Sequence, residues 1–183
     1  MTMLIKQAAC QLVIIDVQTK LSTAMPAEGM QQLLKNTQIL AQAAQLLAIP
    51  TVVTEQYPQG LGATLTEIKQ YCESVEAVAK TAFSACAEPR FNQQLHRDRP
   101  QIIITGMEAH ICVLQTALDL VAMGKQVFVV EDAIISRSSE NKTNAVARMR
   151  DVGCVVTNTE SVLFECLAHA QHEAFKTLSK LIR

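Results

Sequence analysis

Short runs of β-branched and apolar residues alternate along the chain with longer segments whose apolar residues recur at helical spacing. The short runs, such as "LVII", "III" and "VFVV", are continuously apolar instead of alternating in polarity. Continuous apolar strands are typical of parallel sheets with both faces covered by helices. The pattern predicts strands at 10–17, 49–55, 73–80, 101–106, 126–132 and 154–158, and helices at 29–48, 65–71, 88–98, 110–124, 141–153 and 160–183. We therefore expect a three-layer α/β/α sandwich around a Rossmann-like, mostly parallel six-stranded sheet.

Length and charge narrow the classes of partner. A chain of 183 residues suits one domain of ordinary size, and no linker or repeat divides it, so we expect a single domain over 1–183. The net charge of -1 offers no basic face for nucleic acid or membrane, and neither partner is expected. The first 18 residues do not resemble a signal peptide, because Asp16 interrupts their apolar run. A cytoplasmic location follows as an expectation.

The six cysteines are scattered singly through the chain and include no C-x-x-C pair, which favours free thiols over a disulfide framework. Free cysteine usually behaves as a small buried hydrophobe. We assign Cys10, Cys154 and Cys166 to packing, and favour the same interpretation for Cys72 and Cys86. Cys112 is the one cysteine for which its position in the sequence favours a chemical role over packing.

Ligands of doubly wound sheets bind beyond the carboxyl ends of the strands. The candidates at predicted strand ends are Asp16, Glu55, Lys80, the turn 106–112, and Glu131 with Asp132. Taken alone, Asp16 is equally well explained as a helix cap or turn residue, and Lys80 as a surface lysine. Their chemistry depends on what lies beside them.

Cys112 follows a strand-ending glycine and falls in the first turn of the predicted helix 110–124. The positive end of a helix stabilises a thiolate, and a nearby ammonium lowers the thiol pKa further. A neighbouring carboxylate then accepts the thiol proton. The competing interpretation is a core cysteine one turn into a helix.

Three motifs together resemble the isochorismatase-like cysteine hydrolase superfamily: "LVIIDVQ" with Asp16, "AVAKTAFSA" with Lys80 and "ITGMEAHICV" with Cys112. The resemblance covers nearly the whole chain. Within the superfamily, "TEQYPQGLG", "GMEAHIC" and "VVEDAIISRS" are most similar to isochorismatase-domain-containing proteins whose substrate is not established.

The resemblance implies a triad in which Cys112 attacks a carbonyl carbon, Asp16 moves the proton and Lys80 stabilises the thiolate. It also implies a cis peptide between Met107 and Glu108, and an oxyanion hole formed by the backbone N–H groups of Glu108 and Cys112. A homo-oligomer is implied as well, and the apolar segment 161–170 is compatible with one.

Two differences from other members of the superfamily narrow the range of reactions that we expect. Nicotinamidases of this superfamily bind a metal through histidines after the second strand, but no histidine lies between Lys20 and Lys80 here, so we expect no metal and no cofactor. Isochorismatases that cleave a vinyl ether generally lack the nucleophilic cysteine, and Cys112 argues against that reaction.

The predicted substrate pocket consists of side chains near strand ends or in the turn, each of which is equally well explained by packing or capping. They are Gln18, Glu55, Gln56, Tyr57, Phe83 and His110, with Glu108 beside them. If Glu55 and Glu108 both point inward, they disfavour an anionic substrate. The alternative is that Arg90 or Arg137 pairs with them.

The sequence favours a metal-independent cysteine hydrolase that cleaves the C–N bond of a small amide. One alternative is a binding or regulatory module that keeps the fold and a vestigial site. A second is a redox-responsive protein in which Cys112 is oxidised, with Cys86 as the residue that could approach it.

Overall fold

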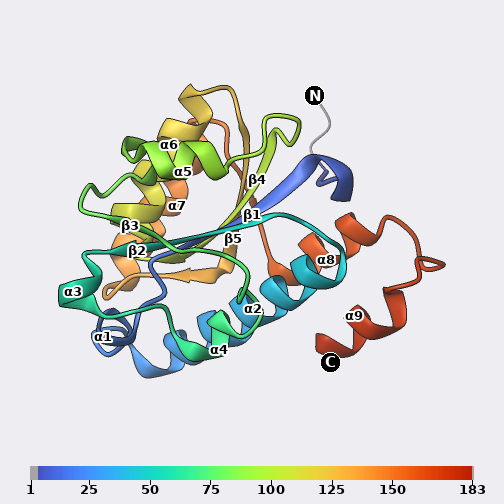
Figure 1. Cartoon of the computed structure of the whole chain (residues 1–183), viewed down its shortest axis with the longest axis horizontal. Helices are drawn as coiled ribbons and strands as arrows, with labels where there is room; N and C mark the ends of the chain where they lie inside the picture. The colour runs from blue at the N-terminus through green and yellow to red at the C-terminus, as the bar shows by residue number, and fades with distance from the viewer. Residues whose placement is uncertain (1–3, 183) are drawn as a thin grey trace.

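The computed structural model describes residues 4–182, and within them a single six-stranded sheet forms the centre of the molecule (Figure 1). Its strands are β1 (Cys10–Ile15), β2 (Thr51–Gln56), β3 (Val78–Lys80), β4 (Gln101–Met107), β5 (Gln126–Ile135) and β6 (Val155–Thr157). The strand order is β3-β2-β1-β4-β5-β6, and every pairing is parallel. All residues of β1 and β4 are buried, as their continuous apolar sequences predict.

Helices cover both faces of the sheet (Figure 1). One core cluster joins the sheet to α2 (Ala27–Leu46), α4 (Thr66–Lys69), α8 (Thr159–Leu167) and α9 (Phe175–Leu181). The other joins it to α5 (Pro89–Gln94), α6 (Leu114–Ala122) and α7 (Ser139–Asp151). Short helical segments lie at Gln7–Ala9 (η1), Thr19–Ser22 (α1), Pro58–Leu61 (α3), Ala85–Ala87 (η2) and Ala109–Val113 (η3). The predicted three-layer α/β/α sandwich is confirmed.

Several elements differ from the prediction, and the predicted strand 73–80 is a strand only over Val78–Lys80. Strand β5 continues to Ile135, beyond the predicted end at 132, so Glu131 and Asp132 lie inside the strand. The predicted helix 160–183 is two helices, because the chain leaves α8 at Ala168 with a left-handed φ of 60° and resumes as α9. Its last residue, Arg183, lies outside the described residues. The start of the predicted helix 110–124 is the π-helical turn η3, which α6 continues.

The order of the strands reverses between β1 and β4, and this is where a doubly wound sheet opens at its carboxyl end. Here Gly106 of β4 is paired with Ile15 of β1. Gly106 has a φ of 125°, and a Cβ atom built on it would overlap with the carbonyl oxygen of Ile15. The close approach of the two backbones therefore requires glycine.

Substituting Gly106 by alanine is expected to lower the free energy of unfolding by about 2–4 kcal/mol, because the new methyl group meets backbone of the adjacent central strand. Gly124 is the matched control: its φ is 79°, yet a Cβ there meets nothing within 4 Å. Gly124→Ala should cost only about 1 kcal/mol. Urea denaturation compares the two variants, and equal midpoints would contradict the close-approach argument.

Within residues 4–182, no helix combines the length and the apolar character that crossing a membrane requires.

Candidate active site

Asp16 follows the last residue of β1 and has a left-handed φ of 51°. Its backbone N–H donates to the carbonyl of Thr54 at 3.2 Å, and the Thr54 hydroxyl donates to Asp16 Oδ1 at 2.7 Å. The residue is fully buried. The neighbouring strand β2 therefore fixes the carboxylate at the carboxyl edge of the sheet. Sequence reasoning missed Thr54, which the parallel register pairs with Ile15.

Lys80 is the last residue of β3, and its ammonium lies 2.7 Å from Asp16 Oδ2. Both side chains are fully buried. Lys80 Nζ also donates to Gln56 Oε1 at 2.6 Å and to the Phe83 carbonyl at 3.1 Å. The ammonium is thus held by hydrogen bonds, and the pair carries no net charge.

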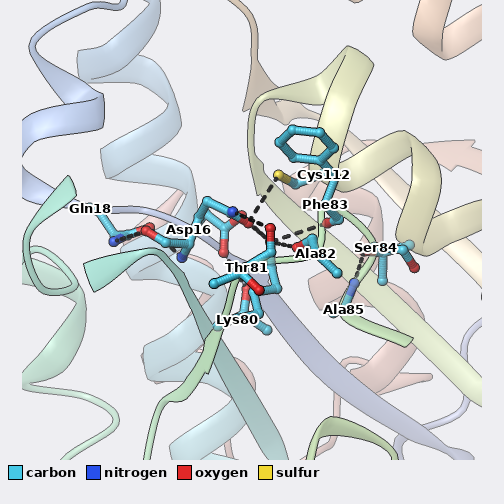
Figure 2. Close-up of polar contacts among 12 residues, drawn as sticks. Asp16, Gln18, Lys80, Thr81, Ala82, Phe83, Ser84, Ala85 and Cys112 are labelled. Carbon is cyan, nitrogen blue, oxygen red and sulfur yellow. Dashed lines mark hydrogen bonds and ion pairs between the residues drawn. The ribbon is translucent and has the colours of Figure 1, made fainter. Parts of the chain in front are cut away.

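Cys112 lies in the η3 turn that follows β4, and the charges of Asp16 and Lys80 both act on its thiol. The Cys112 sulfur also lies 4.0 Å from Gln56 Oε1. In Figure 2 the sulfur points toward the Asp16 and Lys80 side chains. Three residues that are far apart in sequence therefore meet in one cluster, which we call the Asp–Lys–Cys cluster.

The Cys112 thiol is a neutral thiol in this cluster. Burial and the Asp16 carboxylate raise its pKa to about 12, and the opposing effect of Lys80 is smaller. On the order of 10⁻⁵ of such a thiol is ionised at pH 7. The expectation of a lowered thiol pKa is therefore wrong: it considered the helix end and the ammonium, but not the loss of water around the sulfur.

Alkylation of Cys112 by iodoacetamide should accelerate about tenfold per pH unit with no plateau below pH 10, since the thiolate fraction grows up to the pKa of about 12. Lys80→Ala should slow the reaction further, because it removes the charge that lowers the pKa. Cys86, whose pKa burial raises to about 11, is the internal control in the same peptide digest. A plateau near pH 7 at Cys112 would contradict this prediction.

A model of the isochorismatase domain matches residues 10–161, which include all three residues of the cluster. The human isochorismatase domain-containing protein 2 is 41% identical over 147 residues, 79% of this chain and 69% of that protein. The secreted isochorismatase effector Isc1 of Phytophthora sojae is 39% identical over 153 residues, 80% of this chain and 72% of that protein. The chain belongs to the isochorismatase family.

Solved structures of this fold agree with the family. The structure described as MAR1 ribonuclease from Caenorhabditis elegans has a TM-score of 0.92 at 35% identity, covering 97% of this chain and 91% of that one. A nicotinamidase from Bacillus subtilis has a TM-score of 0.69 at 19% identity, covering 82% and 99%, and shows the shared fold alone. The resemblance that the motifs indicate is confirmed.

Two of the predicted pocket residues of this isochorismatase-family chain make hydrogen bonds that order the loop after β2. The Gln18 amide is fully buried, donates to the carbonyls of Gln56 and Gly62, and accepts from the Gln56 N–H. Glu55 Oε1 accepts from both the N–H and the hydroxyl of Thr64 at 2.7 Å. Both side chains therefore position the loop.

Gln56, Tyr57 and Phe83 lie closer to the Asp–Lys–Cys cluster. Gln56 Oε1 contacts both Lys80 and Cys112, a link that the sequence did not indicate. Tyr57 and Phe83 are about half exposed, at 55% and 53%. They are apolar surface on the segments that follow β2 and β3.

The Met107–Glu108 peptide bond is cis. The Glu108 carboxylate accepts from the backbone N–H and the Nε of Arg137 at 3.0 and 3.1 Å, so it is paired and buried. Arg90 instead pairs with Glu76 on the surface. Since Arg137 neutralises Glu108, and Glu55 is bonded to a loop, these carboxylates supply no argument about substrate charge.

His110 is tied to the segment after β5. Its Nδ1 lies 2.9 Å from Ser136 Oγ, and its Nε2 lies 3.4 Å from Asn141 Nδ2.

Asp132 Oδ1 accepts from the N–H and hydroxyl of Thr159 at the start of α8, away from the cluster. In the part of the chain from 4 to 182, no group of three or more His, Cys, Asp or Glu residues is arranged to hold a metal ion.

Proposed function

We propose that this protein is a metal-independent cysteine hydrolase that cleaves the C–N bond of a small, neutral amide. The observation that carries the proposal is the position of the Cys112 sulfur, which points toward the buried Asp16–Lys80 pair (Figure 2) and shares Gln56 Oε1 with the Lys80 ammonium. A thiol, a carboxylate and an ammonium at one site are the groups that acyl transfer through a thioester requires.

The neutral thiol assigns a definite task to Asp16. The carboxylate takes the Cys112 proton while the sulfur attacks the carbonyl carbon, so no free thiolate has to exist beforehand. Asp16 then gives this proton to the departing nitrogen as the C–N bond breaks, leaving a thioester on Cys112. Water, deprotonated by Asp16, attacks the thioester and releases the acid and the thiol.

Lys80 and the backbone complete the machinery. The Lys80 ammonium stabilises the negative charge of Asp16 and of the Cys112 sulfur during these steps. Its hydrogen bonds to Gln56 and Phe83 hold it in place. The N–H groups of Glu108 and Cys112 are assigned to the developing oxyanion.

Charge favours a neutral substrate. The buried Asp16–Lys80 pair beside the Cys112 thiol has no net charge that would attract an ionic substrate. The name of the nematode structure raises RNA as a competing substrate. RNA carries one negative charge per nucleotide and is usually bound by unpaired cations, whereas the Lys80 ammonium is occupied by Asp16.

The proposal is tested by incubating the protein with a panel of small primary amides and with RNA oligonucleotides, and measuring ammonia release and RNA cleavage. Acid quenching followed by intact mass measurement should trap an acyl group on wild-type protein, which peptide mapping places on Cys112. An acyl adduct on another residue, or RNA cleavage without amide hydrolysis, would overturn the proposal. Absence of both activities would favour the binding or regulatory module.

A homo-oligomer and a cytoplasmic location belong to the same proposal. Light scattering after size-exclusion chromatography measures the subunit number, and a monomer at micromolar concentration would contradict the first of them.

A further inference from the structure

The two oxygen atoms of the Asp16 carboxylate have chemically different partners. The Lys80 ammonium donates to Oδ2 at 2.7 Å, whereas the Thr54 hydroxyl donates to Oδ1, also at 2.7 Å. All three residues are buried. The carboxylate therefore has a charged partner on one oxygen and an uncharged partner on the other.

The Thr54 hydroxyl is held in place by the centre of the sheet. The parallel register pairs Thr54 with Ile15 of β1 on one side and with Val78 of β3 on the other. The Thr54 carbonyl also accepts from the N–H of Asp16 at 3.2 Å. Backbone pairing on both sides thus fixes the hydroxyl relative to the carboxylate.

The two partners differ in what they can accept. An ammonium has only donor hydrogens, whereas a hydroxyl has one donor hydrogen and two acceptor lone pairs. A proton on Asp16 Oδ2 would face the donor hydrogens of Lys80 at 2.7 Å. A proton on Oδ1 meets the Thr54 hydroxyl, which can turn and accept it. The protonated form of Asp16 is therefore favoured on the Thr54 side.

We infer that Thr54 is a positioning residue that places the transferred proton on Asp16 Oδ1. The inference rests on the proposed hydrolysis. As the Cys112 sulfur forms the bond to the carbonyl carbon, its S–H bond breaks, an O–H bond forms at Oδ1, and the Thr54 hydroxyl turns from donor to acceptor. When the C–N bond breaks, Oδ1 returns the proton to the nitrogen and the hydroxyl donates again. Lys80 stays bonded to Oδ2 throughout.

The inference predicts a dependence on the leaving group. The nitrogen of an amide must be protonated as it departs, so its hydrolysis needs the proton that Oδ1 returns. A p-nitrophenolate leaves as an anion and needs no proton. Loss of the Thr54 hydroxyl should therefore slow the amide more than the ester, whereas a purely structural role would slow both equally.

The test compares kcat/KM for the primary amide identified in the panel and for the p-nitrophenyl ester of the same acid, after subtraction of the rates of Cys112→Ala. Thr54→Val should lower kcat/KM for the amide roughly 10–100-fold, mainly through kcat, and this loss should exceed the loss on the ester at least ~10-fold. Thr54→Ser keeps the hydroxyl and should keep the ratio of the two values within about threefold of wild type. Equal losses on both substrates in Thr54→Val, or the same change of ratio in Thr54→Ser, would overturn the inference.

The two variants are matched in stability. Valine loses a hydrogen bond and serine loses a buried methyl group, so each should lower the Tm by roughly 5 °C. Because both substrates are measured in one preparation, a partly unfolded variant does not alter the ratio. Absence of an acyl group on Cys112 of wild-type protein with both substrates would remove the proposed hydrolase and this inference with it. An acyl group on Cys112 together with an unchanged ratio in Thr54→Val would overturn the inference alone.

Discussion

Cys112→Ala is expected to lower kcat/KM for the amide identified in the panel by at least ~10³-fold, because the variant has no sulfur to form the thioester. The thiol is buried and small, so its loss should change the free energy of unfolding by only about 1 kcal/mol. Steady-state ammonia release and circular dichroism melting measure the two effects separately.

Cys86→Ala provides the matched control for this substitution. Cys86 is a partly buried thiol whose sulfur contacts the carbonyl of Thr116. Its removal should leave kcat/KM within about twofold of wild type, because the residue has no part in the proposed steps. Amide hydrolysis that survives in Cys112→Ala at the wild-type rate would exclude Cys112 as the nucleophile.

Lys80→Met should both abolish turnover and destabilise the fold by about 3–5 kcal/mol. The substitution removes the ammonium partner of the fully buried Asp16 carboxylate. The Thr54 hydroxyl still donates a hydrogen bond to this carboxylate, but it carries no charge. Urea denaturation measures the loss of stability.

The double variant Asp16→Asn/Lys80→Met separates structure from chemistry. It removes both charges while keeping side chains of similar size, so most of the stability lost in Lys80→Met should return. Turnover should not return, because no carboxylate remains to accept the thiol proton. If the double variant were as unstable as the sum of its single variants, the two charges would not be coupled and the ion-pair argument would fail.

The sheet and the convergence of the cluster could be predicted because they follow from local patterns. Continuous apolar runs located the strands, and the polar residue at the end of each run marked the carboxyl edge. Asp16 and Lys80 end on the same edge because all the strands are parallel, which the alternation with helices already predicts. Such inferences require only the positions at which strands and helices end. They do not require the contacts between side chains.

What could not be predicted depends on tertiary contacts. The polar residues Glu131 and Asp132 indicate a strand end at 132, yet Glu131 faces solvent within β5 and Asp132 accepts a hydrogen bond from Thr159 at the start of α8. The π-helical turn around Cys112 has no sequence signature. The raised pKa of the Cys112 thiol arises mainly from burial, which the residues next to Cys112 in the sequence do not reveal.

The division between strand ends and loops also determines how this scaffold can be altered. Asp16 and Lys80 are fixed by the hydrogen bonding of the sheet, whereas Tyr57 and Phe83 lie on connecting segments with about half of their surface exposed. Randomising 57–61 and 81–83 would therefore diversify the approach to the sulfur without disturbing the strands. Such a library would search for new specificities in the proposed amide hydrolysis while Asp16 and Lys80 stay in place.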